Sequence, residues 1–353
     1  MDELKNLLAK LSNAHGISGY EDDVREIIKE ELEDYVDEIR VDNLGNIICV
    51  KNGSDLELMV AAHIDEIGFM VKYIDDKGFI RITPIGGWFD QTVLNQRVIL
   101  HGSKGKVYGV LGCKPPHLMK NDERNKVIKI ENMFVDVGAS SKDEVIEMGI
   151  TVGTPITIDR EFAELGGKKV TGKAFDNRAG VAAMIEAIKQ TKSDATIYAV
   201  GTVQEEVGLK GARTSAFALE PDAAIALDVC IAADFPGTES AYMDVKAGGG
   251  PAITVVDASG RGLIASKKVI EWLKTTAEKH SIPYQLEVAE GGTTDATAIH
   301  LTKAGIPTGV VSVPTRYIHT PVEVLDLEDL KNTASLTAKA LETAEKYFKP
   351  KRR

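Results

Sequence analysis

The sequence has few cysteines and no pattern of cysteine pairs. Cys49, Cys113 and Cys230 are the only three among 353 residues, and each lies in an apolar stretch. Secreted disulfide-rich domains carry an even number of cysteines at regular spacings, so this class of protein is excluded. The pattern favours reduced, buried thiols with a structural role, and we expect a cytoplasmic protein.

Positive charge is also scarce. Lysine and arginine total 42 against 53 aspartate and glutamate residues, which gives a formal net charge of -11. Proteins that bind nucleic acids obtain most of their affinity from basic side chains that neutralise phosphates. The only basic cluster, "KPKRR" at 349–353, is too short to outweigh the acidic remainder, so we expect no nucleic-acid partner.

Long hydrophobic runs are missing as well. No apolar stretch approaches the roughly 20 residues that a helix needs to cross a bilayer. The first residues, "MDELKNLLAKLSNAHG", alternate charged residues with leucine, which is typical of an amphipathic helix and not of a signal peptide. We therefore expect no membrane association and no secretory leader.

The remaining pattern predicts an α/β protein with an insertion. A chain of this length exceeds the usual size of a single hydrophobic core, so two domains are expected. Helical and strand patterns alternate in 1–66 and 167–353, with helices such as "ATAIHLTKAG", which predicts a mostly parallel mixed sheet flanked by helices. Between them, 67–166 contains short strands with glycine-rich turns and predicts an inserted all-β domain. Within it, "KPPHLMKNDERNKVIKIEN" at 114–132 predicts a long exposed loop.

One local signal predicts where a helix begins. The stretch "SGYEDDVREIIKEELEDYV" contains Ser18 and Glu21 at the spacing of a capping box, followed by apolar residues on one helical face. We therefore expect the Ser18 hydroxyl and the Glu21 carboxylate to cap this helix.

Acidic and imidazole side chains collect where the predicted strands end. The members of this set are His63 and Asp65 after "LMVAA", Glu205 and Glu206 after "ATIYAVGTV", Asp228 in "AAIALDV", His319 after "TGVVSVP" and Asp176 at the start of a helix. In open α/β sheets ligands bind in the crevice outside the carboxyl ends of the strands, so we expect these seven side chains to converge.

Their convergence predicts a metal site. Like charges a few ångströms apart in a low-dielectric crevice repel by several kcal/mol unless a cation lies between them. Imidazole and carboxylate without thiolate suit zinc, cobalt or manganese in a hydrolytic centre. Two histidines and three acids suffice for two ions if one carboxylate bridges them, and such a pair activates a water. The two-residue spacing of His63 and Asp65 would let Asp65 orient the imidazole.

The same residues carry a resemblance to a known family. In order and spacing, "AAHIDEIGFMV", "AFDNRAG", "VQEEVGLKGA", "ALDV" and "YIHTP" resemble the tetrahedral (TET) aminopeptidases, which are cytosolic dinuclear-metal peptidases. The resemblance covers the whole chain, including the inserted β domain and "GGTTDATAIHLTKAGIPTG". It implies hydrolysis of the amino-terminal residue of short peptides with two divalent ions, zinc or cobalt. It also implies that the insertion is a dimerisation domain and that dimers assemble into a hollow dodecamer.

The resemblance further implies roles for individual residues. Asp176 would bridge two ions, His63 and Asp228 would belong to one ion, and Glu206 and His319 would belong to the other. Glu205 would be the general base and Asp65 would support the site from behind. The glycine-rich "EGGTTDA" would lie beside the substrate through Gly292 and Thr294, and Thr294 or Asp295 would cap the helix that follows.

Substrate preference and packing yield two further expectations. The residues of "GGTTDATAIH" and "VVSVPTRY" are mostly small or uncharged, so we expect neutral, mostly apolar amino-terminal residues to be preferred. Trp88, in "IGGWFDQ" of the insertion, is expected to pack or to form an interface and not to contact substrate.

Three other functions remain open at this point. A hydrolase that removes acyl groups or carboxy-terminal residues would need a basic anchor, for which Arg178, Arg213 and Arg316 are the candidates. A glycosidase could use the paired acids Glu205 and Glu206, although this leaves the strand-end histidines unexplained. A non-catalytic assembly protein would have no use for Glu205.

Overall fold

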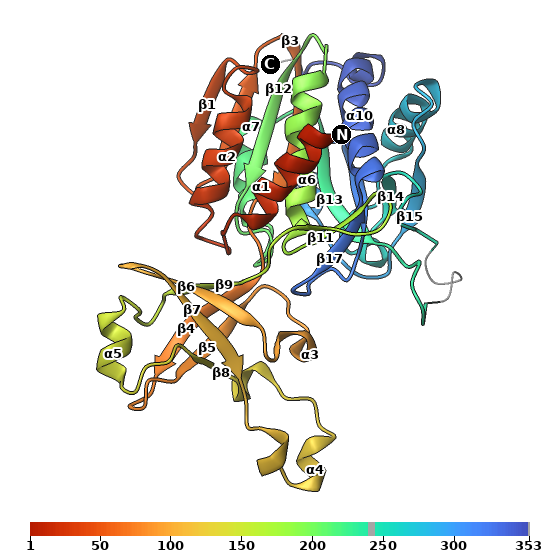
Figure 1. Cartoon of the computed structure of the whole chain (residues 1–353). Helices are drawn as coiled ribbons and strands as arrows, with labels where there is room; N and C mark the ends of the chain where they lie inside the picture. The colour runs from red at the N-terminus through yellow and green to blue at the C-terminus, as the bar shows by residue number, and fades with distance from the viewer. Residues whose placement is uncertain (239–243, 352–353) are drawn as a thin grey trace.

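The computed structural model describes residues 1–238 and 244–351, which form two connected parts (Figure 1). The upper part in Figure 1 is an 11-stranded sheet with helices on both faces, and the lower part is a closed β-barrel. The path through the large sheet is β1-β2-β12-β3-β13-β16-β17-β11-β10, and β14 and β15 extend it beside β16.

The strands of the large sheet are β1 (Glu38–Val41), β2 (Ile47–Lys51), β3 (Ser54–His63), β10 (Ala163–Glu164), β11 (Lys169–Gly172), β12 (Ala195–Thr202), β13 (Ala223–Ile231), β14 (Ala252–Val256), β15 (Gln285–Val288), β16 (Thr308–Arg316) and β17 (Glu323–Asp326). Its helices are α1 (Asp2–Asn13), α2 (Asp22–Leu32), α6 (Phe175–Gln190), α7 (Lys210–Leu219), α8 (Lys267–Lys279), α9 (Asp295–Ile299) and α10 (Leu327–Thr343), with short turns η3 (Ala258–Gly260) and η4 (Ala344–Lys346).

The centre of the sheet is parallel and its borders are antiparallel. Strands β12, β3, β13 and β16 run parallel to their neighbours in that order, whereas β2 pairs antiparallel with β12 and β17 pairs antiparallel with β16. Strand β13 reads "AAIALDVCI" and is buried along all but its last residue. Such a near-continuous apolar run is typical of a strand that helices cover on both faces. All four central strands therefore end at the same edge of the sheet.

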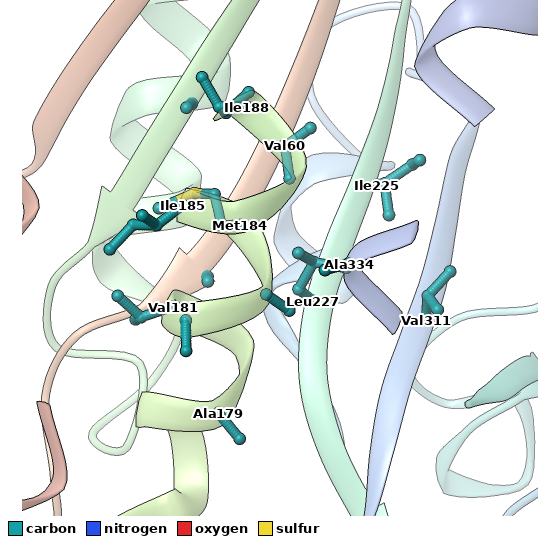
Figure 2. Close-up of a cluster of buried hydrophobic side chains, with 14 of the residues drawn as sticks. Val60, Ala179, Val181, Met184, Ile185, Ile188, Ile225, Leu227, Val311 and Ala334 are labelled. Atoms are coloured by element: carbon teal, nitrogen blue, oxygen red, sulfur yellow. The ribbon is translucent and has the colours of Figure 1, made fainter. Parts of the chain in front are cut away.

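The core lies on both sides of these central strands. Figure 2 shows part of the core on one side, a buried cluster that contains Val181 and Ile185 of α6 together with the strand residues Val60, Ile225 and Leu227. On the other side, the alternate strand residues Met59, Ala61 and Ala224 pack with side chains of α7 and α9. Because neighbouring strand residues point to opposite faces, one run of apolar residues serves both layers. The helix α6 is thereby fixed with its first turn at the carboxyl edge of the sheet.

The β-barrel is formed by six antiparallel strands in the order β4-β5-β8-β7-β6-β9. The strands and helices of this part are β4 (Gly68–Ile74), β5 (Ile80–Ile85), α3 (Asp90–Val93), β6 (Arg97–Gly102), β7 (Gly105–Gly112), α4 (Asn121–Arg124), β8 (Phe134–Asp136), α5 (Lys142–Glu147) and β9 (Pro155–Ile158). Its own core contains Phe69, Leu100, Val135 and Ile156. The next strand, β10, pairs with β11 in the large sheet, so the chain rejoins that sheet before residue 167.

Three local expectations differ from the structure. The predicted loop at 114–132 contains two single 3-10 turns, η1 (Pro116–Leu118) and η2 (Ile130–Asn132), besides α4, and Ile130 is buried. The helix expected over "ATAIHLTKAG" ends already at Ile299. All three cysteines are free, but Cys113 is only half-buried, whereas Cys49 and Cys230 are buried. None of the helices in 1–238 and 244–351 is long and apolar enough to cross a membrane.

The predicted capping box is wrong. Glu21 precedes α2, but its side chain makes no capping hydrogen bond to that helix. The Ser18 hydroxyl donates instead to Asp65 Oδ2 at 2.6 Å, and Glu21 Oε1 accepts from the backbone N–H of Gly19 and of Gln204. Both side chains are buried against the carboxyl edge of the sheet, so a contact distant in sequence replaces the local cap.

A buried ion network joins three segments beneath that edge. Lys173 Nζ lies 2.8 Å from Glu66 Oε2, and Arg178 Nη2 lies 3.5 Å from Glu66 Oε1. Lys173 also donates to Ala14 O and Arg178 to Leu11 O, each at 2.8 Å, which ties the end of α1 to the same network. Their side chains are at most 3% exposed. The network therefore holds the segment after β3 against the start of α6.

Removing one charge from this network should destabilise the fold. In Lys173→Met, Glu66 loses its two shortest ionic contacts and stays buried, and breaking a buried pair in this way costs about 3–5 kcal/mol. Denaturant titration at a fixed protein concentration measures the free energy of unfolding. Lys168→Met is the matched control, because Lys168 pairs with Glu328 at the surface and such pairs contribute at most about 1 kcal/mol. Equal stabilities of the two variants would contradict this role.

Candidate metal centre

The seven side chains expected to converge do so at the carboxyl edge of the central strands. His63 is the last residue of β3 and lies opposite Thr202, the last residue of β12. Glu205 and Glu206 follow β12, Asp228 lies near the end of β13, His319 follows β16, and Asp176 lies in the first turn of α6. Since parallel neighbours end together, strands that are far apart in sequence deliver these groups to one place.

Three of these side chains form a first group around His63. Its Nε2 lies 3.1 Å from Asp176 Oδ1 and 3.7 Å from Asp228 Oδ1. One nitrogen and two carboxylate oxygens from these residues lie within 4.8 Å of one another, a spacing that could hold a metal ion. Glu205 Oε2 is slightly farther from the same nitrogen, at 3.9 Å.

A second group forms around His319. Its Nε2 lies 3.3 Å from Asp176 Oδ2 and 3.4 Å from Glu206 Oε2, and these atoms also have the spacing of metal ligands. Asp176 therefore belongs to both groups, with Oδ1 toward His63 and Oδ2 toward His319. The other oxygen of Glu206, Oε1, is buried without a hydrogen-bond partner.

Asp65 lies behind the first group and connects it to the loop after β12. Its Oδ1 is 3.5 Å from His63 Nδ1, and its backbone oxygen is 3.2 Å from the same nitrogen. The carboxylate also accepts the backbone N–H of Glu205 at 3.0 Å and of Glu206 at 3.2 Å. With the Ser18 hydroxyl as a further donor, one fully buried carboxylate holds both strand ends.

Burial and neighbouring charges shift the pKa values of the groups at this site. Burial raises the pKa of Glu205 well above its usual range, and the charges of Asp228 and Glu206 add to this while His63 opposes it. Burial also raises the pKa of Asp228. Burial lowers the pKa of His319, but its contacts with Asp176 and Glu206 outweigh burial and raise that pKa to about 11. Bound cations would offset the repulsion among the carboxylates, and they would displace protons from the imidazoles, because histidine binds metal in its neutral form.

The donor set fits divalent cations. The groups offer imidazole nitrogens and carboxylate oxygens and no thiolate, which is the chemistry of hydrolytic zinc, cobalt or manganese sites. The unpartnered Glu206 Oε1 is a buried polar atom that a cation would satisfy. Asp65 and Glu323 already hold the ligand-bearing segments by hydrogen bonds, as neighbours of metal ligands commonly do.

Two buried acids beside the site were missed by the sequence analysis. Glu323 accepts hydrogen bonds from the backbone N–H of Asp176 and of His319. Asp295 accepts a hydrogen bond from Thr202, and burial raises its pKa to about 7. The sequence pattern indicates Asp295 only as a candidate for the helix cap. In the structure the cap is Thr294, because its hydroxyl accepts a hydrogen bond from the backbone N–H of Ala296. Glu323 carries a weak signal, its position four residues after His319.

The barrel supplies one wall of the site. Trp88 stacks on Phe69 with ring centroids 4.8 Å apart and donates from Nε1 to Gly68 O, so the expected packing role is confirmed. It also lines a small hollow together with Asp176, Glu206, His319 and Glu323. Gly87 is so close that an added Cβ would lie 3.1 Å from His319 Nδ1. The backbone of the insertion therefore touches the second group.

The remaining candidates of the sequence analysis belong to none of these ligand groups. Gly292 is exposed with φ +77, and nothing lies within 4 Å of the position of an added Cβ. Arg178 is fully buried in the ion network, and Arg316 pairs with Asp234 at 2.6 and 2.8 Å. Arg213 is exposed on α7. Arg178 and Arg316 are thus already occupied and do not offer a free basic anchor for a substrate carboxylate.

Comparison with known proteins identifies the family of this chain. Residues 45–336 match the model of the M42 glutamyl aminopeptidase family. The solved structure of an aminopeptidase from the archaeon Desulfurococcus kamchatkensis is 47% identical, covers 97% of this chain and 95% of that chain, and superimposes with a TM-score of 0.93. The lysyl aminopeptidase of Pyrococcus furiosus is 39% identical over 95% of each chain.

A further solved structure bears on assembly. It is the TET1 peptidase of Pyrococcus horikoshii, which can assemble into a tetrahedron or a large octahedral shell. It is 35% identical, covers 95% of this chain and 98% of that chain, and has a TM-score of 0.86. Taken with the family match over most of the chain, these likenesses show that the chain belongs to the M42 glutamyl aminopeptidase family and is a metal-dependent aminopeptidase of the TET type.

Proposed function

We propose that this aminopeptidase removes the amino-terminal residue of short peptides with two divalent ions, zinc or cobalt, held at the carboxyl edge of the sheet. The observation that carries the proposal is the position of Asp176, whose two oxygens face His63 and His319 separately. His63, Asp176 and Asp228 would hold one ion, and Asp176, Glu206 and His319 the other. Bound there, the ions would polarise the scissile carbonyl and lower the pKa of a water molecule toward neutrality.

Glu205 is the general base in this proposal. Its carboxylate reaches the first group, and its backbone N–H donates to Asp65, which holds the main chain at this position. It takes a proton from the attacking water and passes that proton to the leaving amine. Burial and neighbouring acids raise the pKa of Glu205, and cations nearby would lower it again, which leaves a group able to gain and lose a proton.

The substrate end of the site is acidic, which suits a peptide with a free amino terminus. An ammonium group is attracted to the carboxylates around Glu205, and Gly292 and Thr294 would lie beside the first residue of the peptide. We expect that residue to be neutral and mostly apolar. The family is described as glutamyl aminopeptidase, whereas the relative from Pyrococcus furiosus is named a lysyl aminopeptidase. The names of relatives therefore differ in the preferred amino-terminal residue, and the preference of this chain must be measured.

The assembly is the other part of the proposal. The barrel, within the inserted domain 67–166, exposes large apolar side chains, among them Tyr73, Phe89 and Tyr108. Exposed apolar surface of this kind is typical of contacts between subunits. We propose that the barrel forms a dimer and that dimers build a tetrahedral dodecamer in the cytoplasm, where three free cysteines would stay reduced.

Metal removal tests the proposed chemistry. A panel of aminoacyl chromogenic substrates, including leucyl, glutamyl and lysyl derivatives, should lose turnover after exhaustive chelation and regain it when cobalt or zinc is added. The physical reason is that the clustered carboxylates are negatively charged and cannot themselves polarise the scissile carbonyl, which a metal ion can do. Full activity of protein shown to be metal-free by elemental analysis would contradict the proposal. The panel without chelator measures the preferred residue.

The two adjacent acids should respond differently to substitution. Glu205→Gln keeps shape but removes the base, so metal content should persist while kcat falls by roughly 10²-fold or more. Glu206→Gln should weaken metal binding instead, and excess metal should partly restore activity. Glu26→Gln, at an exposed site on α2, serves as the control. Loss of metal from the Glu205 variant alone would show that the two roles are reversed.

The assembly predicts the mass of the particle. Light scattering should give about twelve times the 38.1 kDa mass of one chain at all concentrations above the assembly threshold. Tyr108→Glu places a charge on the exposed face of the barrel, so it should yield smaller species if that face forms contacts. A monomer at every concentration for the unaltered protein would rule the assembly out.

A further inference from the structure

Glu323 connects the two ligand groups although it belongs to neither. It is the first residue of β17 and its side chain is only 2% exposed. One oxygen, Oε2, accepts the backbone N–H of Asp176 at 2.9 Å, and the other, Oε1, accepts the backbone N–H of His319 at 3.1 Å. The two oxygens of one carboxylate therefore hold the backbones of two proposed ligands from different segments.

The distance between Asp176 and His319, the two residues whose backbones Glu323 holds, determines the geometry of the second group. Asp176 is shared by both groups, whereas His319 belongs only to the second. Their side chains approach within 3.3 Å, between Asp176 Oδ2 and His319 Nε2. Glu323 anchors both backbones at once, so it fixes the distance across the second group independently of the side chains.

The two histidines differ in how they are supported. His63 ends a central strand, and its ring lies beside both the carboxylate and the backbone oxygen of Asp65. His319 lies in the loop between β16 and β17 with φ 60, a backbone conformation that residues other than glycine rarely adopt. Its side chain is 39% exposed, against 2% for His63. The second group therefore depends more on an added anchor than the first.

The hydrogen bonds also argue against Glu323 as a ligand. Each of its oxygens is directed at a backbone N–H, and among the described residues none of the clusters with ligand spacing contains it. A carboxylate that accepts two N–H groups behind the ligands can fix their position without contacting substrate. Glu323 also lines the hollow beside Asp176 and His319, so its replacement would change the surroundings of both residues.

We propose that Glu323 is a positioning residue that sets the affinity of the second metal group by holding the Asp176 and His319 backbones at a fixed separation. The inference rests on the two-ion function proposed above. Its removal affects the second group, Asp176, Glu206 and His319, more than the first. Partners behind metal ligands typically change metal affinity by 10–100-fold when they are replaced.

Two substitutions test this role with metal binding as the readout. Glu323→Gln keeps the size but replaces one acceptor oxygen by an amide that cannot accept from an N–H. Glu323→Asp keeps the charge but shortens the side chain by one methylene. Glu328→Gln is the control, because Glu328 lies five residues away and pairs with Lys168 at the surface. Metal-free preparations of each would be titrated with cobalt by calorimetry, and their unfolding would be followed without metal.

The unaltered protein and the control should bind two equivalents of cobalt. In both Glu323 variants one equivalent should weaken by about tenfold or more while the other changes little, so the ratio of the two affinities shifts. A purely structural role would lower the stability of the metal-free protein and leave that ratio unchanged, which would overturn the proposal. If the unaltered protein fails to bind two equivalents, the two-ion function falls first and the inference falls with it.

Discussion

Repulsion among buried carboxylates is the constraint on which the structure depends. Asp176, Glu205, Glu206 and Asp228 lie within a few ångströms of one another around two histidines, in a region where burial disfavours every charge. Charges at such separations in a protein interior interact by several kcal/mol. Without cations, this repulsion would destabilise a fold that brings these groups together. Divalent cations bound there would turn the same repulsion into attraction, which is why the arrangement points to metal chemistry before any relative is considered.

The fold meets this constraint by holding several of these segments through buried hydrogen bonds and ion pairs. Parallel strands bring their ends to one edge, Asp65 joins the ends of β3 and β12 by hydrogen bonds, and the Glu66 network fixes the start of α6. The barrel borders the site through Trp88 and Gly87. The insertion thus has two tasks in this account, since the same part of the chain borders the metal groups and exposes the apolar surface proposed for assembly.

The sequence predicts well where the acidic and imidazole side chains meet, because most of them follow strands with strong apolar patterns. His63, Glu206, Asp228 and His319 stand at the ends of such runs, and a strand end has a defined place in a parallel sheet. Support from behind was harder to predict. Ser18 and Glu21 have the spacing of a cap, yet Ser18 bonds Asp65, 47 residues away, and no local pattern encodes that contact.

Glu323 and Asp295 show the same limit. Glu323 accepts a hydrogen bond from Asp176, which is 147 positions away in the sequence. Asp295 accepts one from the Thr202 hydroxyl, which is 93 positions away. Each residue looks like an ordinary strand or helix terminus when it is viewed locally. Membership of the M42 family removes the main support for the glycosidase and assembly-protein alternatives, which the paired acids alone had left open.

The account is tested most directly by locating the ions in a crystal of the protein prepared with zinc. Anomalous scattering measured on both sides of the zinc absorption edge identifies the element and its position without reference to activity. The account predicts two zinc ions in each subunit, one among His63, Asp176 and Asp228 and one among Asp176, Glu206 and His319. A single ion, or zinc bound elsewhere while these carboxylates stay free, would contradict it.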